Sequence, residues 1–456
     1  MNLITSGNKK KHALLIFPRP KGSKTSNDAF FPFPFLGLTQ VAASLSAHFN
    51  VRIVDERISH ISGKEKTDIV FITALTSTVY RAYFLADIFR KREIPVIMGG
   101  IHATVLPEEA SRHATSVVIG EAEDIIDTII SDYENGMLAP AYRRPCRPEL
   151  DSIPCPDLGL LNWRHRAFLS PIQTSRGCPN NCNFCSVPAV SGRKLRLKSV
   201  STIEKELNAL SRFRSRNLFV VDDNFTVMKD RAMAIMDIFR FYGFRWMGFS
   251  NLWVCEDREF LQAMQKSRCV SLFIGFESLN NQGHLSKNRS YQSPESIRDA
   301  ADRIHAYKIG IQGSFIFGFD EDRADVFQNT VSLIQDSGIE LPNINILTPF
   351  PGTPLFDSME RENRFIHKDW SRYDMSHTVF RPANMSPEEL QQGYAWALKY
   401  LSSPTSIMSR LKKGIGNIPY LLLANFSLHR QQTSLARSLW NPEVQRFMQK
   451  RGLCLC

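Results

Sequence analysis

The sequence contains no apolar run that approaches the roughly 20 residues a membrane-spanning helix needs. Its N-terminus, MNLITSGNKKKHALLIF, does place basic residues before apolar ones. The apolar run there is only about five residues long, whereas a signal peptide has roughly 7–15. We therefore interpret this run as the first core strand of a protein expected in the cytoplasm, with peripheral contact to a membrane left open.

Cysteine is scarce, and its distribution excludes a secreted disulfide framework. The chain has nine cysteines in 456 residues, which is an odd number. They are unevenly spaced, and none precedes Cys146. A disulfide scaffold would instead place an even number of cysteines in a short chain. We expect reduced thiols, with chemistry at the three that cluster in TSRGCPNNCNFC, residues 174–185.

The composition does not have the low hydropathy of a disordered chain, because 43% of the residues are hydrophobic and 22% are charged. At 456 residues, two or three domains are expected. The net charge is +11, and residues 376–456 hold ten Lys and Arg against three Asp and Glu. A solvated basic face explains this excess. Nucleic acid, anionic lipid and an acidic substrate are the alternatives, and the lack of an aromatic-interleaved RNA motif disfavours nucleic acid.

Short apolar runs alternate with helical spacing from His12 to about Gly136. Five runs predict buried strands: ALLIF (13–17), VRIVD (51–55), DIVFITA (68–74), PVIMGG (95–100) and SVVIG (116–120). This alternation predicts a flavodoxin-like, doubly wound α/β domain over residues 1–145, whose ligand lies outside the carboxyl ends of the strands. Those ends, TALTST, GGIHAT and GEAED, are small or polar, so the backbone can approach a large flat ligand closely.

A proline-rich passage, residues 146–170, predicts an extended linker. Residues 171–375 then repeat strand and helix six times, which predicts a partial (β/α)6 barrel. The six strand runs are PIQTS (171–175), NLFVVDD (217–223), FRWMGFS (244–250), SLFIGFES (271–278), IQGSFIFGF (311–319) and NINILTPF (343–350). From residue 376 to 456 the pattern is helical and basic, and Ser386 is expected to cap the first helix there.

Cys178, Cys182 and Cys185 follow the first barrel strand, where barrel enzymes carry catalytic loops. Three thiolates suit an iron–sulfur cluster or zinc. A structural zinc would need a fourth ligand nearby, but Cys155 and His165 lie in or near the linker. Thiols without a ligand are the third alternative. We favour a four-iron cluster, because the loop supplies amides for the sulfides and three ligands leave one iron open to chelate a small molecule.

The segment CPNNCNFC resembles the Cys-x-x-x-Cys-x-aromatic-Cys motif of radical S-adenosylmethionine (SAM) enzymes, with Phe184 in the aromatic place. The order of GGIHAT, GEAED, DDNF, IGFES, GSFIFGFDED and TPFPGTPLF around it is similar to the cobalamin-binding branch of that family. The resemblance covers about residues 13–356. It implies a [4Fe-4S] cluster on the three cysteines, SAM and cobalamin as cofactors, and an electron donor such as a flavodoxin or ferredoxin.

The resemblance also implies SAM contacts in the barrel. Phe184 would lie beside the adenine. The segment Asp222, Asp223 and Asn224 stands where many relatives have Gly-Gly-Glu, so that one carboxylate would pair with the SAM ammonium and one Asp would alternatively cap the next helix. Further implied contacts at the strand ends are Glu277, Ser278, Gly313 and Gly318. Strand glycines also mark bulges, which is the alternative for the last two.

The expected cobalamin site lacks the Asp-x-His-x-x-Gly motif that supplies an axial histidine in many cobalamin proteins, and His102 does not have that context. The resembling branch commonly leaves the lower face of cobalt without histidine, which suits methyl transfer. The implied corrin contacts are Thr73, Thr76, Gly99, Gly100, His102, Gly120 and Glu121. A doubly wound domain that has lost its ligand is the alternative.

The leading hypothesis is an enzyme that cleaves SAM reductively and methylates an unactivated carbon of a small-molecule or lipid substrate from methylcobalamin. A cyclase, oxidase or rearranging enzyme would need the same cofactors. A non-catalytic cobalamin- or redox-responsive binding protein is the third hypothesis. A methylthiotransferase acting on RNA is disfavoured, because that family usually has three further cysteines in its first domain.

Overall fold

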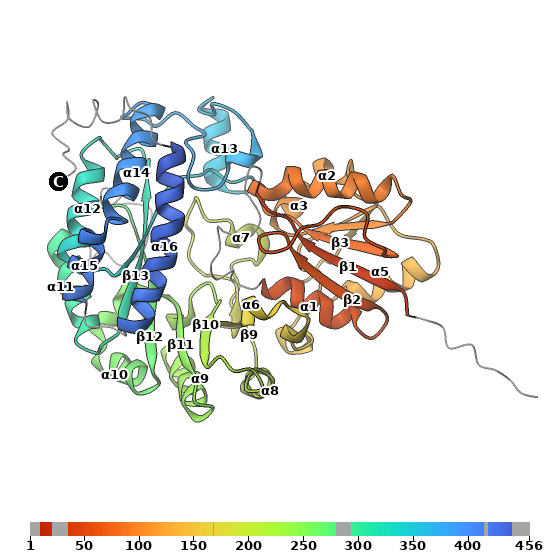
Figure 1. Cartoon of the computed structure of the whole chain (residues 1–456), viewed down its shortest axis with the longest axis horizontal. Coiled ribbons are helices and arrows are strands. Elements are labelled where there is room, and N and C mark those ends of the chain that lie inside the picture. The colour runs from red at the N-terminus through yellow and green to blue at the C-terminus, as the bar shows by residue number, and fades with distance from the viewer. Residues whose placement is uncertain (1–9, 21–34, 167, 280–292, 415–417, 440–456) are drawn as a thin grey trace, which may run out of the picture. The chain divides into compact units, whose positions relative to one another are not determined.

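The computed structural model describes residues 10–20, 35–166, 168–279, 293–414 and 418–439 (Figure 1). These residues form two compact units, and the chain passes from the first to the second after Arg166. Both are α/β units with parallel sheets, as the sequence predicts. Within the described ranges, no helix is long and apolar enough to cross a membrane.

The N-terminal unit has one six-stranded sheet in the order β2-β1-β3-β4-β5-β6, and every pairing is parallel. Its strands are β1 (His12–Phe17), β2 (Asn50–Asp55), β3 (Ile69–Thr73), β4 (Val96–Gly99), β5 (Ser116–Ile119) and β6 (Ala141–Arg143). The order of the first five confirms the doubly wound class. The strand β6 was not predicted, because AYR is a three-residue run with only Tyr142 buried.

Helices cover this sheet because the connections between its parallel strands carry apolar faces. They are α1 (Leu36–Leu45), α2 (Val79–Arg90), α3 (Ile101–Val105), α4 (Pro107–Ser111) and α5 (Ile126–Glu134), with a 3₁₀ turn η1 (Thr76–Thr78) after β3. Leu15, Phe71 and Ile129 are among the residues of the core. Glycine-containing turns follow β4 and β5, and the short helices α3 and α4 lie between these two strands in the chain. The expected ligand site lies at these turns.

The proline-rich passage folds against the N-terminal unit up to Arg166. It contains two 3₁₀ turns, η2 (Leu150–Ser152) and η3 (Leu158–Leu160), and the short helix α6 (Trp163–Arg166). The Nε2 atom of His165 lies 2.9 Å from the Asp55 carboxylate at the end of β2, and both side chains are buried. This buried pair fixes the passage to the sheet, so it is more than the extended spacer that its prolines predict.

The second unit contains the partial barrel, a parallel sheet in the order β14-β13-β12-β11-β10-β7. Its strands are β7 (Ser170–Ile172), β10 (Asn217–Val220), β11 (Arg245–Ser250), β12 (Cys269–Glu277), β13 (Gly310–Phe317) and β14 (Leu341–Ile346). The connecting helices are α8 (Val200–Leu210), α9 (Lys229–Phe241), α10 (Arg258–Lys266), α11 (Pro294–His305) and α12 (Val326–Asp336). The six strands confirm the predicted partial barrel, and their sequential order places all carboxyl ends at one mouth.

Four helices follow the barrel strands: α13 (Pro354–Arg361), α14 (Pro387–Leu401), α15 (Pro404–Lys413) and α16 (Ile418–Leu439). Ser386 caps α14 as predicted, because its hydroxyl accepts a 3.1 Å bond from the Glu389 amide. The Glu389 carboxylate accepts a 2.8 Å bond from the Ser386 amide in return, which completes a capping box. α14 then packs against α16, β14 and α12.

Candidate functional site

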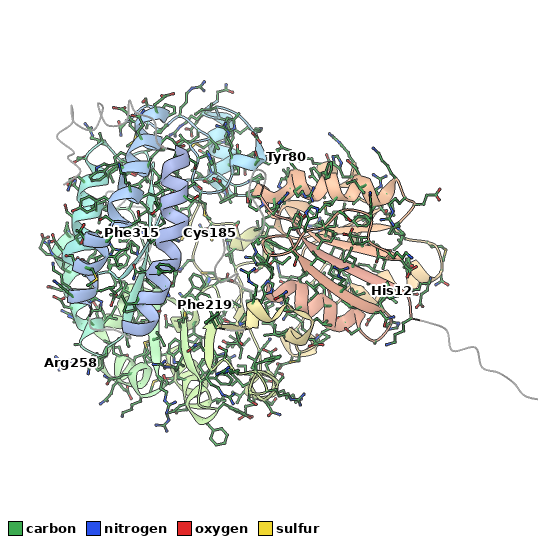
Figure 2. The ribbon with its side chains drawn as sticks, viewed as in Figure 1. His12, Tyr80, Cys185, Phe219, Arg258 and Phe315 are labelled. Atoms are coloured by element: carbon green, nitrogen blue, oxygen red, sulfur yellow. The ribbon has the colours of Figure 1, made fainter. Side chains whose placement is uncertain are left out.

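The three clustered cysteines lie on a loop between two short antiparallel strands, β8 (Ser175–Arg176) and β9 (Arg196–Leu197). Gly177 begins this loop with a φ of +94°, and a Cβ there would overlap the carbonyl oxygen of Lys194. The two ends of the loop are therefore in van der Waals contact, and only glycine fits between them. Figure 2 marks Cys185 on this loop and Phe315 on the barrel strand β13.

All three thiols are partly buried, and desolvation raises the pKa of each. The pKa of Cys182 rises to about 11, first through burial and then through the nearby Cys185, Glu277 and Cys178. Metal binding would therefore displace a proton from each thiol, because the thiolate is the form that binds metal. Within the described residues no three His, Cys, Asp or Glu side chains converge closely enough for a single metal ion. A cluster whose thiolates each bind a different iron does not require that convergence.

Two further segments fix the loop from outside. The amide of Leu355, at the start of α13, donates a 3.0 Å bond to the carbonyl of Asn183. The ring of Phe184 meets the ring of Phe319 edge to face, with centroids 5.9 Å apart. The motifs TPFPGTPLF and GSFIFGFDED, which contain Leu355 and Phe319, therefore support the cysteine loop directly.

Asp222, at the end of β10, is a fully buried structural residue. Its carboxylate accepts bonds from the Thr174 amide at 2.6 Å, the Thr174 hydroxyl at 2.5 Å and the Ser175 hydroxyl at 2.7 Å. Burial raises the pKa of Asp222, while these hydrogen bonds oppose the rise. Both oxygens are used within the chain, so the carboxylate fixes the segment that leads into β8.

Asp223 points toward the cysteine loop, where its carboxylate accepts a 2.9 Å bond from the Gly177 amide. Burial raises its pKa, and its charge in turn raises the pKa of Cys178 and Cys185. Neither carboxylate caps α9, whose N-cap residue is Met228. The buried Asn224 accepts a 3.2 Å bond from Thr226. Of Asp222, Asp223 and Asn224, it is Asp223 whose charge acts on the thiols.

Glu277 ends β12 in a strained conformation, with a φ of +59°. Its carboxyl group folds back over Gly275, where a Cβ would overlap Oε1. Desolvation raises the pKa of Glu277 to about 7, and its charge acts on Cys182 and Cys185. A non-glycine residue at positive φ costs on the order of 1–3 kcal/mol, and such strain clusters at functional sites. Glu277 and Asp223 thus present two desolvated carboxyl groups to the three thiols.

Ser278 is connected to the next strand through Asp322, a fully buried residue that the sequence did not single out. Asp322 accepts a 3.2 Å bond from the Ser278 hydroxyl, and bonds of 2.9 Å and 3.1 Å from the amides of Gly318 and Phe319. It therefore fixes the turn that carries Phe319 to Phe184. Its only sequence signal is the acidic run DED, which begins three residues after β13 ends.

The two barrel glycines are explained by packing. Gly313 lies beside the stacked rings of Phe276 and Phe315, whose centroids are 5.1 Å apart, and a Cβ would come within 3.2 Å of both rings. Gly318 has a φ of +106°, and a Cβ would lie 2.8 Å from Leu390 of α14. Contact of either glycine with SAM stays a prediction.

In the N-terminal unit, turns bring the predicted corrin contacts to the ends of β3, β4 and β5. A Cβ on Gly100 would lie 2.7 Å from the Thr73 hydroxyl, so these turns are packed together. Gly120 has a φ of +96°, yet nothing lies within 4 Å of where its Cβ would be. That open space fits close approach of a flat ligand. Gly99 is the last residue of β4, and Thr76 begins the turn η1 that follows β3. The Glu121 side chain is mostly buried, 3.9 Å from Arg147.

His102 does not present its imidazole at these strand ends. Its side chain is fully buried, and its Nε2 atom lies 3.4 Å from the Glu109 carboxylate of α4. The Tyr83 hydroxyl of α2 donates a 3.0 Å bond to the same carboxylate. Burial lowers the pKa of His102, although Glu109 opposes this, so the ring is held neutral inside the unit. The residues at these strand ends therefore fit a corrin whose cobalt receives no ligand from His102.

Comparisons with known proteins agree with this geometry. Residues 172–334 match the radical SAM superfamily, residues 28–130 match the B12 binding domain, and residues 353–450 match a domain of unknown function. The chain is 30% identical over 441 residues to bacteriochlorophyllide d C-12(1)-methyltransferase of Chlorobaculum tepidum, covering 94% of this chain and 95% of that enzyme. It is 26% identical over 392 residues to hopanoid C-2 methylase of Rhodopseudomonas palustris, covering 80% and 73% respectively.

Solved structures show the same fold. The radical SAM methyltransferase TsrM from Kitasatospora setae, solved with cobalamin and a [4Fe-4S] cluster, superimposes with a TM-score of 0.65 at 14% identity. That match covers 94% of this chain and 99% of TsrM. The cobalamin-dependent radical enzyme OxsB gives a TM-score of 0.66 at 14% identity, over 97% of this chain and 76% of OxsB.

Proposed function

The chain belongs to the cobalamin-binding radical SAM family, and from that premise we propose that it methylates an unactivated carbon of a small-molecule or lipid substrate. It is a radical SAM enzyme, and its cofactors are a [4Fe-4S] cluster, SAM and cobalamin. The single observation that carries the proposal is the loop of three thiols beside two desolvated carboxyl groups, on a chain that also has a B12 binding domain.

When bound, the cluster with SAM supplies reductive cleavage of a carbon–sulfur bond, and cobalamin supplies a transferable methyl group. In this proposal Cys178, Cys182 and Cys185 hold three irons of the cluster. Asp223 and Glu277 would bind the positive charges of SAM, because both carboxyl groups lie close enough to the thiols to act on them electrostatically. Phe184, fixed by Phe319, provides the apolar surface for the adenine.

Asp222 and Asp322 act behind these contacts in the proposal. Asp222 holds Thr174 and Ser175, and thereby the strand from which the loop begins. Asp322 holds the turn beneath Phe319. Both carboxylates are buried and hydrogen-bonded within the chain, so their role is to keep the loop rigid while the cofactors bind.

The relatives support an apolar carbon acceptor. Two are named for methylation of bacteriochlorophyllide d, at C-12(1) and C-8(2), and a third is a hopanoid C-2 methylase. These names describe large, mainly apolar molecules. We extend this class to the present chain, together with an external one-electron donor of the flavodoxin or ferredoxin type.

A ring-forming reaction is the second candidate function. The chain is 23% identical over 402 residues to an anaerobic magnesium-protoporphyrin IX monomethyl ester cyclase of Cereibacter sphaeroides, covering 78% of this chain and 64% of that enzyme. Cyclisation does not transfer a methyl group. Release of S-adenosylhomocysteine together with a methylated product supports methyl transfer. Release of 5′-deoxyadenosine without S-adenosylhomocysteine supports the cyclase.

The same assay distinguishes both enzyme functions from a non-catalytic cobalamin- or redox-responsive protein. Such a protein would bind cobalamin and release neither by-product. The test is anaerobic reconstitution with iron and sulfide, followed by incubation with SAM and reductant and quantification of both by-products.

A further inference from the structure

Residues 373–380, between α13 and α14, lie against the ends of the last two barrel strands. The amide of Ile346, the last residue of β14, donates a 2.7 Å bond to the carbonyl of Met375. A Cβ on Gly318, directly after β13, would lie 3.3 Å from the ring of Phe380. This segment is therefore at the barrel mouth, beside the turn that contacts the cysteine loop.

Asp374 and His377 of this segment form a hydrogen-bonded pair that is partly open. The Nδ1 atom of His377 lies 3.0 Å and 3.1 Å from the two carboxylate oxygens of Asp374. A carboxylate accepts, so Nδ1 donates, and the Nε2 atom of the neutral ring keeps its lone pair. The side chain of His377 is 29% exposed, and among the described residues none is hydrogen-bonded to its Nε2 atom.

The backbone around the pair is fixed on both sides. The Asp374 carboxylate also accepts a 2.9 Å bond from the Ser376 amide. Gln391 of α14 accepts a 2.8 Å bond from the Thr378 amide and donates a 2.9 Å bond to the Ser376 carbonyl. Met375 has a φ of +65°, which is strained for a residue other than glycine, and such strain clusters at active sites and ligand clamps. The imidazole is thus held ready for a ligand.

A histidine that donates from one ring nitrogen to a carboxylate and leaves the other nitrogen open has the arrangement of a metal ligand. A metal ion held by protein side chains alone needs several of them. In the part of the chain that the structure describes, no three His, Cys, Asp or Glu side chains converge in this way. A metal at His377 therefore has to bring its other ligands with it. We propose that the Nε2 atom of His377 binds the central metal of a metallated macrocycle, which is the substrate at the barrel mouth.

This inference rests on the proposed function and names one class among its large, mainly apolar acceptors. A metal-bearing tetrapyrrole belongs to that class, because the ring nitrogens hold the metal in the plane and leave an axial position for imidazole. Met375, two residues before His377, is 45% exposed and adds apolar surface to the segment.

Cobalamin is also a metallated macrocycle, but it fits His377 less well. The face of cobalt that carries the methyl group has to stay open to the acceptor. A histidine of the barrel mouth on that face would compete with the methyl group. The spectrum of cobalt separates the two ligands in the test.

The test titrates the full chain with zinc protoporphyrin IX and, as the ligand without a metal, with protoporphyrin IX. Axial imidazole moves the Soret band of the zinc complex to longer wavelength, and we expect this shift with the wild-type chain. His377→Ala is expected to abolish the shift and to weaken binding about tenfold to hundredfold, and free imidazole is expected to restore the shift. Asp374→Asn is expected to weaken binding about tenfold, because the lost charge makes the imidazole a weaker ligand.

His367→Ala is the matched control. His367 is partly buried near the same segment, and its Nδ1 atom accepts a 3.3 Å bond from the Asp369 amide instead of facing a carboxylate. We expect this variant to bind zinc protoporphyrin IX as the wild type does. Binding of metal-free protoporphyrin IX should not depend on His377, and thermal melting of each variant separates lost binding from lost folding.

No Soret shift with the wild type, or a shift that persists in His377→Ala, overturns the proposal. So does equal loss of the shift in His367→Ala. A nitrogen splitting on Co(II) cobalamin that disappears in His377→Ala would assign the histidine to cobalt and also overturn it. If the SAM assay shows no methyl transfer while the Soret shift depends on His377, the proposed reaction is wrong and the macrocycle site stands.

Discussion

The amide of Gly177 donates a 2.9 Å hydrogen bond to the carboxylate of Asp223, which joins the start of the cysteine loop to the end of β10. The neighbouring Asp222 faces the opposite way, toward Thr174 and Ser175. Two adjacent carboxylates therefore have different roles, one at the thiols and one in the framework. This difference can be measured.

We expect Asp222→Asn and Asp223→Asn to separate stability from SAM binding. Asp222→Asn replaces one accepting oxygen by an amide and leaves buried donors unpaired, which is expected to cost on the order of 2 kcal/mol of unfolding free energy. Asp223→Asn keeps an oxygen for the Gly177 amide but loses the charge, so the KM for SAM is expected to rise about tenfold with little change in melting temperature. Equal loss of stability in both variants would contradict the assignment.

Replacement of Gly177 by alanine is expected to prevent assembly of the cluster. The positive φ and the overlap with Lys194 would force the loop ends apart. Iron content and the visible absorbance after anaerobic reconstitution give the measurement, with about four irons expected in the wild type. Gly243→Ala is the control, because that glycine also has a positive φ and its Cβ would meet nothing within 4 Å.

Triple replacement of Cys178, Cys182 and Cys185 by alanine is expected to abolish the cluster as well. Replacement of the terminal Cys454 and Cys456, which lie outside the described residues, is expected to leave the iron content unchanged. The cluster assignment fails if the triple variant still binds four irons.

The Asp55–His165 pair predicts an acid-dependent loss of stability in the N-terminal unit. Burial alone would raise the pKa of Asp55, but the hydrogen bonds from His165 and Arg57 outweigh it and lower the pKa to about 2. A carboxyl with a lowered pKa stabilises the fold above its unfolded pKa near 4 and loses that contribution as pH falls toward 2. Asp55→Asn is expected to destabilise the cofactor-free protein by about 2 kcal/mol at neutral pH, with a difference that shrinks below pH 4. Denaturant unfolding at several pH values measures this, and a difference independent of pH would refute it.

Cobalamin is expected to bind without a protein nitrogen on cobalt. Electron paramagnetic resonance of the Co(II) form should show no nitrogen splitting from the chain, since the His102 ring is buried against Glu109. His102→Gln is expected to leave the cobalt spectrum unchanged. A nitrogen splitting that disappears in this variant would contradict the account, and failure to retain any corrin would favour a domain that has lost its ligand. Uptake should also raise the melting temperature.

The barrel strands and the cysteine loop could be predicted because their signals are local. The runs of Val, Ile and Phe mark buried strands, and the cysteine spacing is contained in eight residues. The edge strand Ala141–Arg143 could not be predicted from the sequence, because only one of its three side chains is buried. Asp222 and Asp223 were predicted as a pair, but their separate roles depend on hydrogen bonds to residues 46–48 positions away. Asp322 was missed because it is one of three acidic residues in DED, and only the folded turn shows which of them accepts the amides of Gly318 and Phe319.

The stoichiometry of SAM consumption tests the proposed methyl transfer most directly. The reconstituted enzyme would be incubated with reductant, hydroxocobalamin, methyl-labelled SAM and an extract of a strain that lacks the protein. We expect the label on a carbon of a small molecule or lipid, with 5′-deoxyadenosine and S-adenosylhomocysteine formed in equal amounts. Production of 5′-deoxyadenosine without S-adenosylhomocysteine or labelled product would contradict methyl transfer.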